Sequence, residues 1–255
     1  MKKDDSRSFH TGIYYTGDSE QEKEAKRLTL EHLRQVSIGL DDTFQFQCDQ
    51  CGKCCINRED IILNAMDVYR LSKELGLEPP AMIDAYGEIF IDTNTGLPTV
   101  RLRPRGSIKR CLFLESHRCS VHKAKPAVCA LFPLGRYVLF LEGKDGEPDL
   151  NKGEIRYIFN PPHCGSEGET YTVREWLGNF GILPDDPFFL SWSKTVTQLS
   201  VELHRIVRNV PEEMMQAVWY AVYTLLYLDY NTEEEFLPQF EENTAKLVEL
   251  LRNEL

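Results

Sequence analysis

Cysteine is the residue type whose number and spacing could carry chemistry in this 255-residue chain. Four of the eight cysteines fall within eight residues, as Cys48, Cys51, Cys54 and Cys55. The other four lie downstream, as Cys111, Cys119, Cys129 and Cys164. Thiolates are ligands of zinc and of iron–sulfur clusters. A lone Cys-x-x-Cys pair is weak evidence for a metal, but eight cysteines in this arrangement predict that all eight serve metal binding.

The spacing leaves the metal open. Cys48, Cys51 and Cys54 recur every third residue, and together with a remote cysteine this is a ligand spacing of ferredoxins. Zinc takes four thiolates in a tetrahedron. The eight cysteines could hold one cluster and one zinc ion, two clusters, or one centre with spare thiols. We favour an iron–sulfur cluster of the 4Fe-4S type over zinc alone.

Cys54 and Cys55 are adjacent, so we expect their side chains to diverge and not to bind one ion. Cys54 keeps the three-residue rhythm, whereas Cys55 serves a second centre, bridges two metals or packs as a buried free thiol. Gly52 follows Cys51 at a position where a tight turn calls for positive φ. His122 and His163 are alternative ligands, and we expect the cysteines to be preferred over them.

One basic run stands out in an otherwise acidic chain. Arg101, Arg103 and Arg105 alternate along a predicted strand and therefore share a face. We interpret them as a cofactor- or substrate-binding site for a carboxylate or phosphate. Two alternatives are a solvated hairpin face and a set of cations that neutralises the negative thiolate centre.

The remaining composition sets the environment of these thiols. The start of the chain, Met1–Ser8, is charged, and no apolar run approaches the roughly 18 residues of a membrane span. We therefore expect a cytoplasmic protein of bacterial type with no membrane partner. The cytosol keeps thiols reduced, which argues against disulfides. The net charge of −11 argues against nucleic-acid binding, while a protein partner or protein substrate stays open.

Local patterns predict the elements that position the cysteines. We expect a mobile segment over residues 1–18, helices over 19–37 and 65–75, and a short helix after Pro79. Hairpins are predicted over 88–103 and over 136–160, the second turning at 143–146. Beyond residue 172 the chain reads as helical, with capping boxes at Thr172 and Thr232, an Asp186 cap before a helix to about residue 209, and Pro211 opening the next helix.

These elements predict an α+β fold. A tail and helix span residues 1–40, and a cysteine-rich metal-binding domain with short β-hairpins spans 41–180. A helical C-terminal part spans 181–255. The apolar stretch 217–228 is interpreted as a buried helix of that part.

Cys48 to Cys55 resembles the signature of the CxxCxxCC zinc- or iron-chelating domain, the YkgJ-like cysteine-cluster family. The resemblance continues through Asp60–Leu77, Cys111–Leu114, Cys119–His122, Lys125–Pro133 and Cys164–Trp176, and it covers about residues 45–178. The family often has arginine where this chain has Lys125 and Ala130, which puts any contact made by those arginines in doubt.

The resemblance implies metal chelation and says little about a reaction. A related domain occurs in flagellin lysine methylases, which modify proteins and are thought to use an iron–sulfur centre. Three functions therefore stay open: an enzyme that modifies proteins or small molecules, a protein that stores or delivers metal, and an interaction module with a structural metal.

Overall fold

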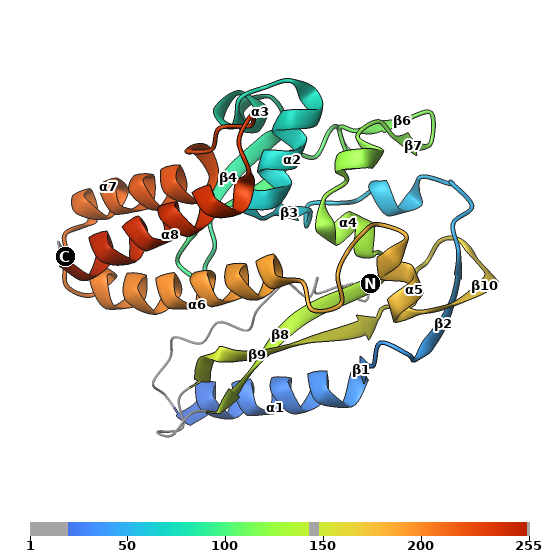
Figure 1. The fold of residues 1–255 in the computed structure, drawn as a ribbon, viewed down its shortest axis with the longest axis horizontal. Helices are drawn as coiled ribbons and strands as arrows, with labels where there is room; N and C mark the ends of the chain where they lie inside the picture. The colour runs from blue at the N-terminus through green and yellow to red at the C-terminus, as the bar shows by residue number, and fades with distance from the viewer. Residues whose placement is uncertain (1–19, 143–147, 254–255) are drawn as a thin grey trace.

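The computed structural model describes residues 20–142 and 148–253. The predicted mobile segment 1–18 and the predicted turn 143–146 lie outside the described residues. The chain is α+β, as predicted, with small antiparallel sheets and a group of C-terminal helices. In Figure 1, these helices lie at one end of the molecule, and the segments β2 and β10, which flank cysteines, lie at the other.

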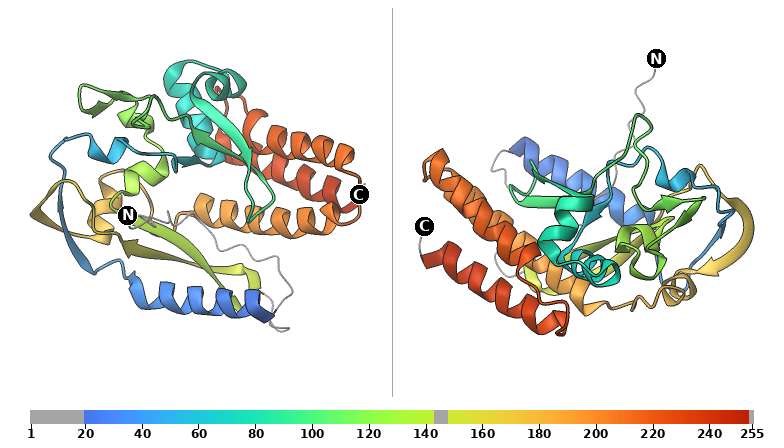
Figure 2. Two further views of the ribbon diagram at one scale, coloured as in Figure 1. Left: turned by 180° about the vertical axis from the view of Figure 1, so that it is seen from behind. Right: turned by 90° about the horizontal axis from the view of Figure 1, so that it is seen from above.

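The helices are α1 (Glu20–Val36), α2 (Ala65–Leu75), α3 (Pro79–Tyr86), α4 (Ala127–Leu131), α5 (Val173–Gly178), α6 (Pro187–Val207), α7 (Glu212–Tyr223) and α8 (Phe236–Asn253). The short turns are the 3-10 helices η1 (Lys53–Cys55) and η2 (His122–Ala124), and the π-helix η3 (Thr224–Leu228). The view from behind in Figure 2 shows α6, α7 and α8 side by side.

The strands are β1 (Ser37–Ile38), β2 (Thr43–Gln47), β3 (Ile62–Leu63), β4 (Gly87–Ile91), β5 (Pro98–Leu102), β6 (Leu114–Glu115), β7 (Arg118–Cys119), β8 (Leu134–Glu142), β9 (Pro148–Phe159) and β10 (Ser166–Thr172). They form four sheets with the orders β1-β9-β8, β10-β2, β3-β5-β4 and β6-β7. Both predicted hairpins are confirmed, as β4–β5 and β8–β9.

Helix ends follow the residues that predicted them. The side chain of Asn64 accepts from the Asp67 amide, and the side chain of Asp67 accepts from the Asn64 amide, so α2 begins with a capping box. The helix ends at Gly76, whose backbone is left-handed. Asp186 caps α6 through the Phe189 amide. The prediction at Thr232 is wrong, because α8 begins only at Phe236, after a turn.

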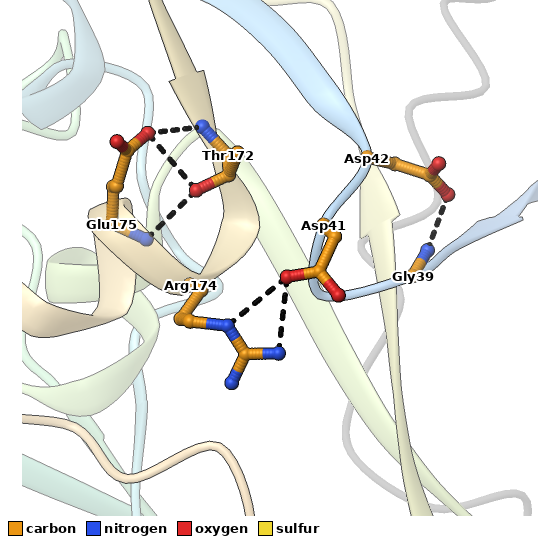
Figure 3. Close-up of polar contacts among 6 residues, drawn as sticks. All are labelled: Gly39, Asp41, Asp42, Thr172, Arg174 and Glu175. Atoms are coloured by element: carbon orange, nitrogen blue, oxygen red, sulfur yellow. Dashed lines mark hydrogen bonds and ion pairs between the residues drawn. The ribbon is translucent and has the colours of Figure 1, made fainter.

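The start of α5 is fastened to the turn that precedes β2 (Figure 3). Thr172 and Glu175 form the predicted capping box, and the Arg174 guanidinium contacts the Asp41 carboxylate at 3.0 Å and 3.1 Å. The main chain adds a bond from the Arg174 amide to the carbonyl of Leu40 at 2.9 Å. Because β10 leads directly into α5, these contacts fix how β10 lies along β2.

Two cores of buried apolar residues support the cysteine segments. The larger one joins α2, α3 and β5 to the C-terminal helices, so residues such as Val68 and Val100 share a core with Leu199 and Val222. The smaller core lies beneath β2, β8 and α5 and contains Trp176, whose indole N–H donates to the Leu131 carbonyl at 3.0 Å. The larger core therefore contains residues from both sides of residue 180, and the division of the chain there stays a prediction.

The apolar stretch 217–228 forms the end of α7 and η3, and many of its side chains pack in the larger core. Within residues 20–142 and 148–253, no helix has the length and apolarity to span a membrane. On α1, Leu33 is buried, whereas Leu28 is 52% exposed.

Candidate metal centre

The first four cysteines lie where β2 runs into η1. Gly52 has a φ of 72°, as its place after Cys51 predicted. A Cβ at Gly52 would lie 3.4 Å from Nδ1 of His117, which itself lies 3.4 Å from the Cys51 carbonyl oxygen. The Cys55 amide then closes the turn on the Gly52 carbonyl at 3.0 Å. Glycine is needed here because the backbone is left-handed and closely covered.

Backbone strain concentrates in the same region. Within the described chain, five non-glycine residues have positive φ, and all lie in segments 50–57 and 109–117: Gln50, Asn57, Lys109, Ser116 and His117. Left-handed backbone at such residues costs energy and is often found at functional sites. These two segments carry four of the eight cysteines, Cys51, Cys54, Cys55 and Cys111.

Main-chain pairing brings the second segment against the first. The Cys111 amide donates to the Cys55 carbonyl at 2.8 Å, next to the bond from the Arg58 amide to the Lys109 carbonyl at 3.1 Å. Cys119 follows on β7, opposite Leu114 of β6. Cys55, Cys111 and Cys119 are thereby held in neighbouring turns.

Cys129 is positioned by a buried carboxylate. It lies on α4, and the amide of Ala127 at the start of α4 donates to Asp67 Oδ1 at 2.9 Å. Asp67 is 2% exposed and comes from α2, and its burial raises the pKa of this carboxyl to about 6. One acid thus caps α2 and fixes the helix that carries Cys129.

Cys164 joins the first cluster through strand pairing. Ser166 pairs with Gln47 across β10 and β2, and the Ser166 hydroxyl donates to Asp49 at 3.1 Å. Burial raises the pKa of the Cys164 thiol to about 11, and the neighbouring thiols of Cys54, Cys51 and Cys48 add to the rise. Cys164 therefore lies with the three cysteines of the ferredoxin-like spacing.

The vicinal pair does not diverge as we expected. Cys54 Sγ and Cys55 Sγ are 3.9 Å apart, because η1 turns both side chains toward the same side. The contact with Cys55 lowers the pKa of the Cys54 thiol to about 6 and raises the pKa of Cys55. Either thiol can donate to the other, and the contact favours a single thiolate in the pair.

Burial raises the pKa of the Cys129 thiol to about 12, and it also raises the pKa of Cys111 and of Cys119. All eight cysteines are free thiols. In the part of the chain that the structure describes, no three His, Cys, Asp or Glu side chains already stand close enough to hold one ion.

Comparison with known proteins finds a family model that resembles this region. Residues 47–158 match the family model described as CxxCxxCC, "Putative zinc- or iron-chelating domain". We call this matched region the CxxCxxCC domain. Neither the curated proteins nor the solved structures include a match to the chain. Seven of the eight cysteines lie within the matched range, and Cys164 follows it. The family description names zinc or iron chelation and no reaction.

The cations beside the thiols of the CxxCxxCC domain are Arg58 and Lys125. Arg58 Nη1 donates to the Cys54 carbonyl at 3.0 Å, and its Nε contacts Asp60 at 2.6 Å. The pKa of Cys54 is lowered most by Cys55 and is raised by burial. Lys125 lowers it further. Sequence reasoning missed Arg58, although a single arginine three residues after Cys55 was the available sign.

The predicted anion site lies on β5 and the loop that follows it. Arg101 contacts Glu88 at 2.5 Å and the Glu59 carbonyl at 3.0 Å, and Arg103 donates to the carbonyls of Asp84 and Gly87. Arg105 forms a β-bridge with Arg110. Anion binding by these arginines stays a prediction, and it would have to compete with these bonds.

The two alternative histidine ligands, His122 and His163, lie on different segments, η2 and the loop before β10. His122 lines a cavity and faces the Phe180 ring, 6.3 Å between centroids, and His163 is exposed in the loop before Cys164.

Proposed function

We propose that the CxxCxxCC domain, together with Cys164, holds two neighbouring four-thiolate centres. The first is an iron–sulfur cluster bound by Cys48, Cys51, Cys54 and Cys164. The second is a zinc ion bound by Cys55, Cys111, Cys119 and Cys129. The two centres meet at the vicinal pair, where one residue of each set follows the other in the chain.

The grouping of the thiols carries the proposal. Cys164 is next to the Cys-x-x-Cys-x-x-Cys segment through the pairing of β10 with β2. Cys55 is bonded through its carbonyl to the amide of Cys111. The contact with Cys54 and burial raise the pKa of Cys55 most. The neighbouring thiols of Cys54, Cys111 and Cys129 raise it further.

Each set suits the metal assigned to it. The first set has the spacing of ferredoxin ligands, and a bound cluster would supply electron transfer or an open iron to a reaction. The second set comes from four separate segments and, unlike the first set with Cys48, has no exposed member, as in a closed zinc site that stabilises a fold. The negative charge of eight thiolates explains why Arg58 and Lys125 lie beside them.

A single zinc shared by the vicinal pair is the second candidate. Two sulfurs at about 2.3 Å from one tetrahedral zinc lie about 3.8 Å apart. The Cys54–Cys55 separation of 3.9 Å is close to this value. In that case Cys54 and Cys55 would be ligands of one ion, and the remaining thiols would divide differently.

The deciding experiment is anaerobic purification after iron supplementation, followed by analysis of iron, zinc and acid-labile sulfide. We expect a brown protein with a broad absorption at about 400 nm, which is typical of thiolate-bound clusters. This absorption should bleach with dithionite. The protein should hold sulfide in proportion to iron and one zinc besides. A colourless protein with zinc and no sulfide would exclude the cluster.

Two cysteine variants test the grouping. Cys164→Ser should remove iron and sulfide and leave zinc, whereas Cys111→Ser should remove zinc and loosen the fold. Ser166→Ala is the matched control, because Ser166 lies beside Cys164 and contacts Asp49 without a thiol. Loss of both metals in both cysteine variants, with the control unchanged, would favour one shared centre over two.

A further inference from the structure

A cavity of about 620 Å³ opens between the CxxCxxCC domain and the loop that leads into α6. One wall comes from α2 and from the η2–α4 segment, including Asp67, Arg70 and Lys125. The opposite wall comes from residues 179–188, after α5. This volume is typical of sites for small molecules. None of the eight cysteines lines the cavity.

The cavity is cationic in a chain whose net charge is −11. Its lining includes the cations Arg70, Lys123, Lys125 and Arg136, against the carboxylates Asp67 and Asp186. An excess of cations in a recess attracts anions. The charge of the cavity is therefore opposite to that of the chain as a whole.

Both carboxylates are already used by the protein. Asp186 contacts Arg136 at 2.7 Å, and Asp67 accepts from the amides of Asn64 and Ala127. Among the described residues, no carboxylate lies within ion-pair distance of Lys123 or Lys125. Neither ammonium group is therefore held in an ion pair with a carboxylate, although Lys125 also lies near Cys54, whose pKa it lowers.

The cations and the apolar wall face each other. Lys125 Nζ lies 5.4 Å from the centroid of the Phe180 ring, and Ile182 and Leu183 continue that wall. Arg70 reaches the same corner, where its Nη2 donates to the Lys123 carbonyl at 3.0 Å. A ligand here would meet positive charge and apolar side chains next to each other.

We propose that this cavity binds a small organic anion. Its carboxylate or phosphate lies at Lys123, Lys125 and Arg70, and its apolar body lies along Phe180, Ile182 and Leu183. The site is distinct from the metal centres, and it adjoins them through α4, which carries Cys129 on the same short helix as the cavity residues Ala127 and Ala130.

The test is calorimetric titration of the full-length, metal-loaded protein with four probes: phenyl phosphate, benzoate, inorganic phosphate and phenol. We expect phenyl phosphate or benzoate to bind more tightly than inorganic phosphate, and phenol not to bind. Whichever of the two organic anions binds better identifies the head group. Binding should weaken as salt rises, because partly exposed charges are screened.

Lys123→Gln and Lys125→Gln should each weaken binding of the preferred organic anion about tenfold, the loss of one charge-assisted hydrogen bond. Lys152→Gln is the matched control, because Lys152 is an exposed lysine of β9 outside the cavity. Metal content is measured on every variant, which separates this test from that of the metal centres. Lys123→Gln keeps the test valid if Lys125→Gln disturbs metal binding. No binding of either organic anion, equal binding of phenol, or unchanged affinity in both lysine variants would overturn the proposal.

Discussion

The ion pair between Arg136 and Asp186 should be among the most costly single contacts to break. Its partner atoms are 2.7 Å apart, and the Arg136 side chain is only 4% exposed and stacks over Phe189, 3.9 Å from the ring centroid. Asp186 also caps α6 through the Phe189 amide. Asp186→Asn keeps an oxygen for the cap, so this change removes the charge and little else.

The expected loss follows from burial. Removing one partner of a buried pair costs roughly 3–5 kcal/mol, because the other charge stays buried without compensation. Asp186 is 20% exposed, so water can partly replace it, and we expect about 3 kcal/mol for Asp186→Asn. Asp186→Ala should cost about 1 kcal/mol more through loss of the cap.

Urea denaturation of the single and double variants measures this coupling. Because Arg136→Met with Asp186→Asn removes both charges, the double variant should be more stable than the sum of the single changes by at least about 2 kcal/mol. Glu242→Gln, which breaks the exposed pair with Lys246, is the matched control and should leave the unfolding midpoint unchanged. Additive losses, or an Asp186→Asn loss no larger than that of the control, would refute the reasoning.

Three further predictions concern the thiols and the arginines. Burial raises the pKa of Cys129 from 9.0 to about 12, so its contribution to the stability of the metal-free protein is present below pH 9 and is lost as pH rises toward 12. The difference between the urea midpoints of the metal-free and the metal-loaded protein should therefore be larger at pH 10 than at pH 7.5. An equal difference at both pH values would count against a buried neutral thiol. Arg58→Gln should lower metal affinity about tenfold or more in a chelator competition, because a cation beside the thiolates is lost; unchanged affinity would assign Arg58 a purely structural role. Replacing Arg101, Arg103 and Arg105 by Gln should leave metal content unchanged in elemental analysis, because Arg101 and Arg103 bond to Glu88 and to backbone carbonyls, and a fall in metal would assign them to the thiolates.

The sequence by itself determined the chemistry and most of the elements. The metal-binding character follows from eight thiols whose spacing needs no fold to be recognised. The first residues of α2, α5 and α6 were predicted because a capping side chain and the amide from which it accepts are three residues apart in the sequence. The Thr232 prediction failed because the same local pattern also fits a turn, and buried Thr232 packs before α8 begins.

Tertiary structure decided which groups meet. Cys164 lies beside Cys48 and Cys51 only because β10 pairs with β2, more than 100 residues away in the chain. The close approach of Cys54 and Cys55 depends on the conformation of η1, which residue spacing does not specify. The cationic cavity joins α2, η2–α4 and the segment before α6, and no local pattern links these three. Such contacts are set by the burial of apolar faces across the whole chain, and therefore only the folded chain shows them.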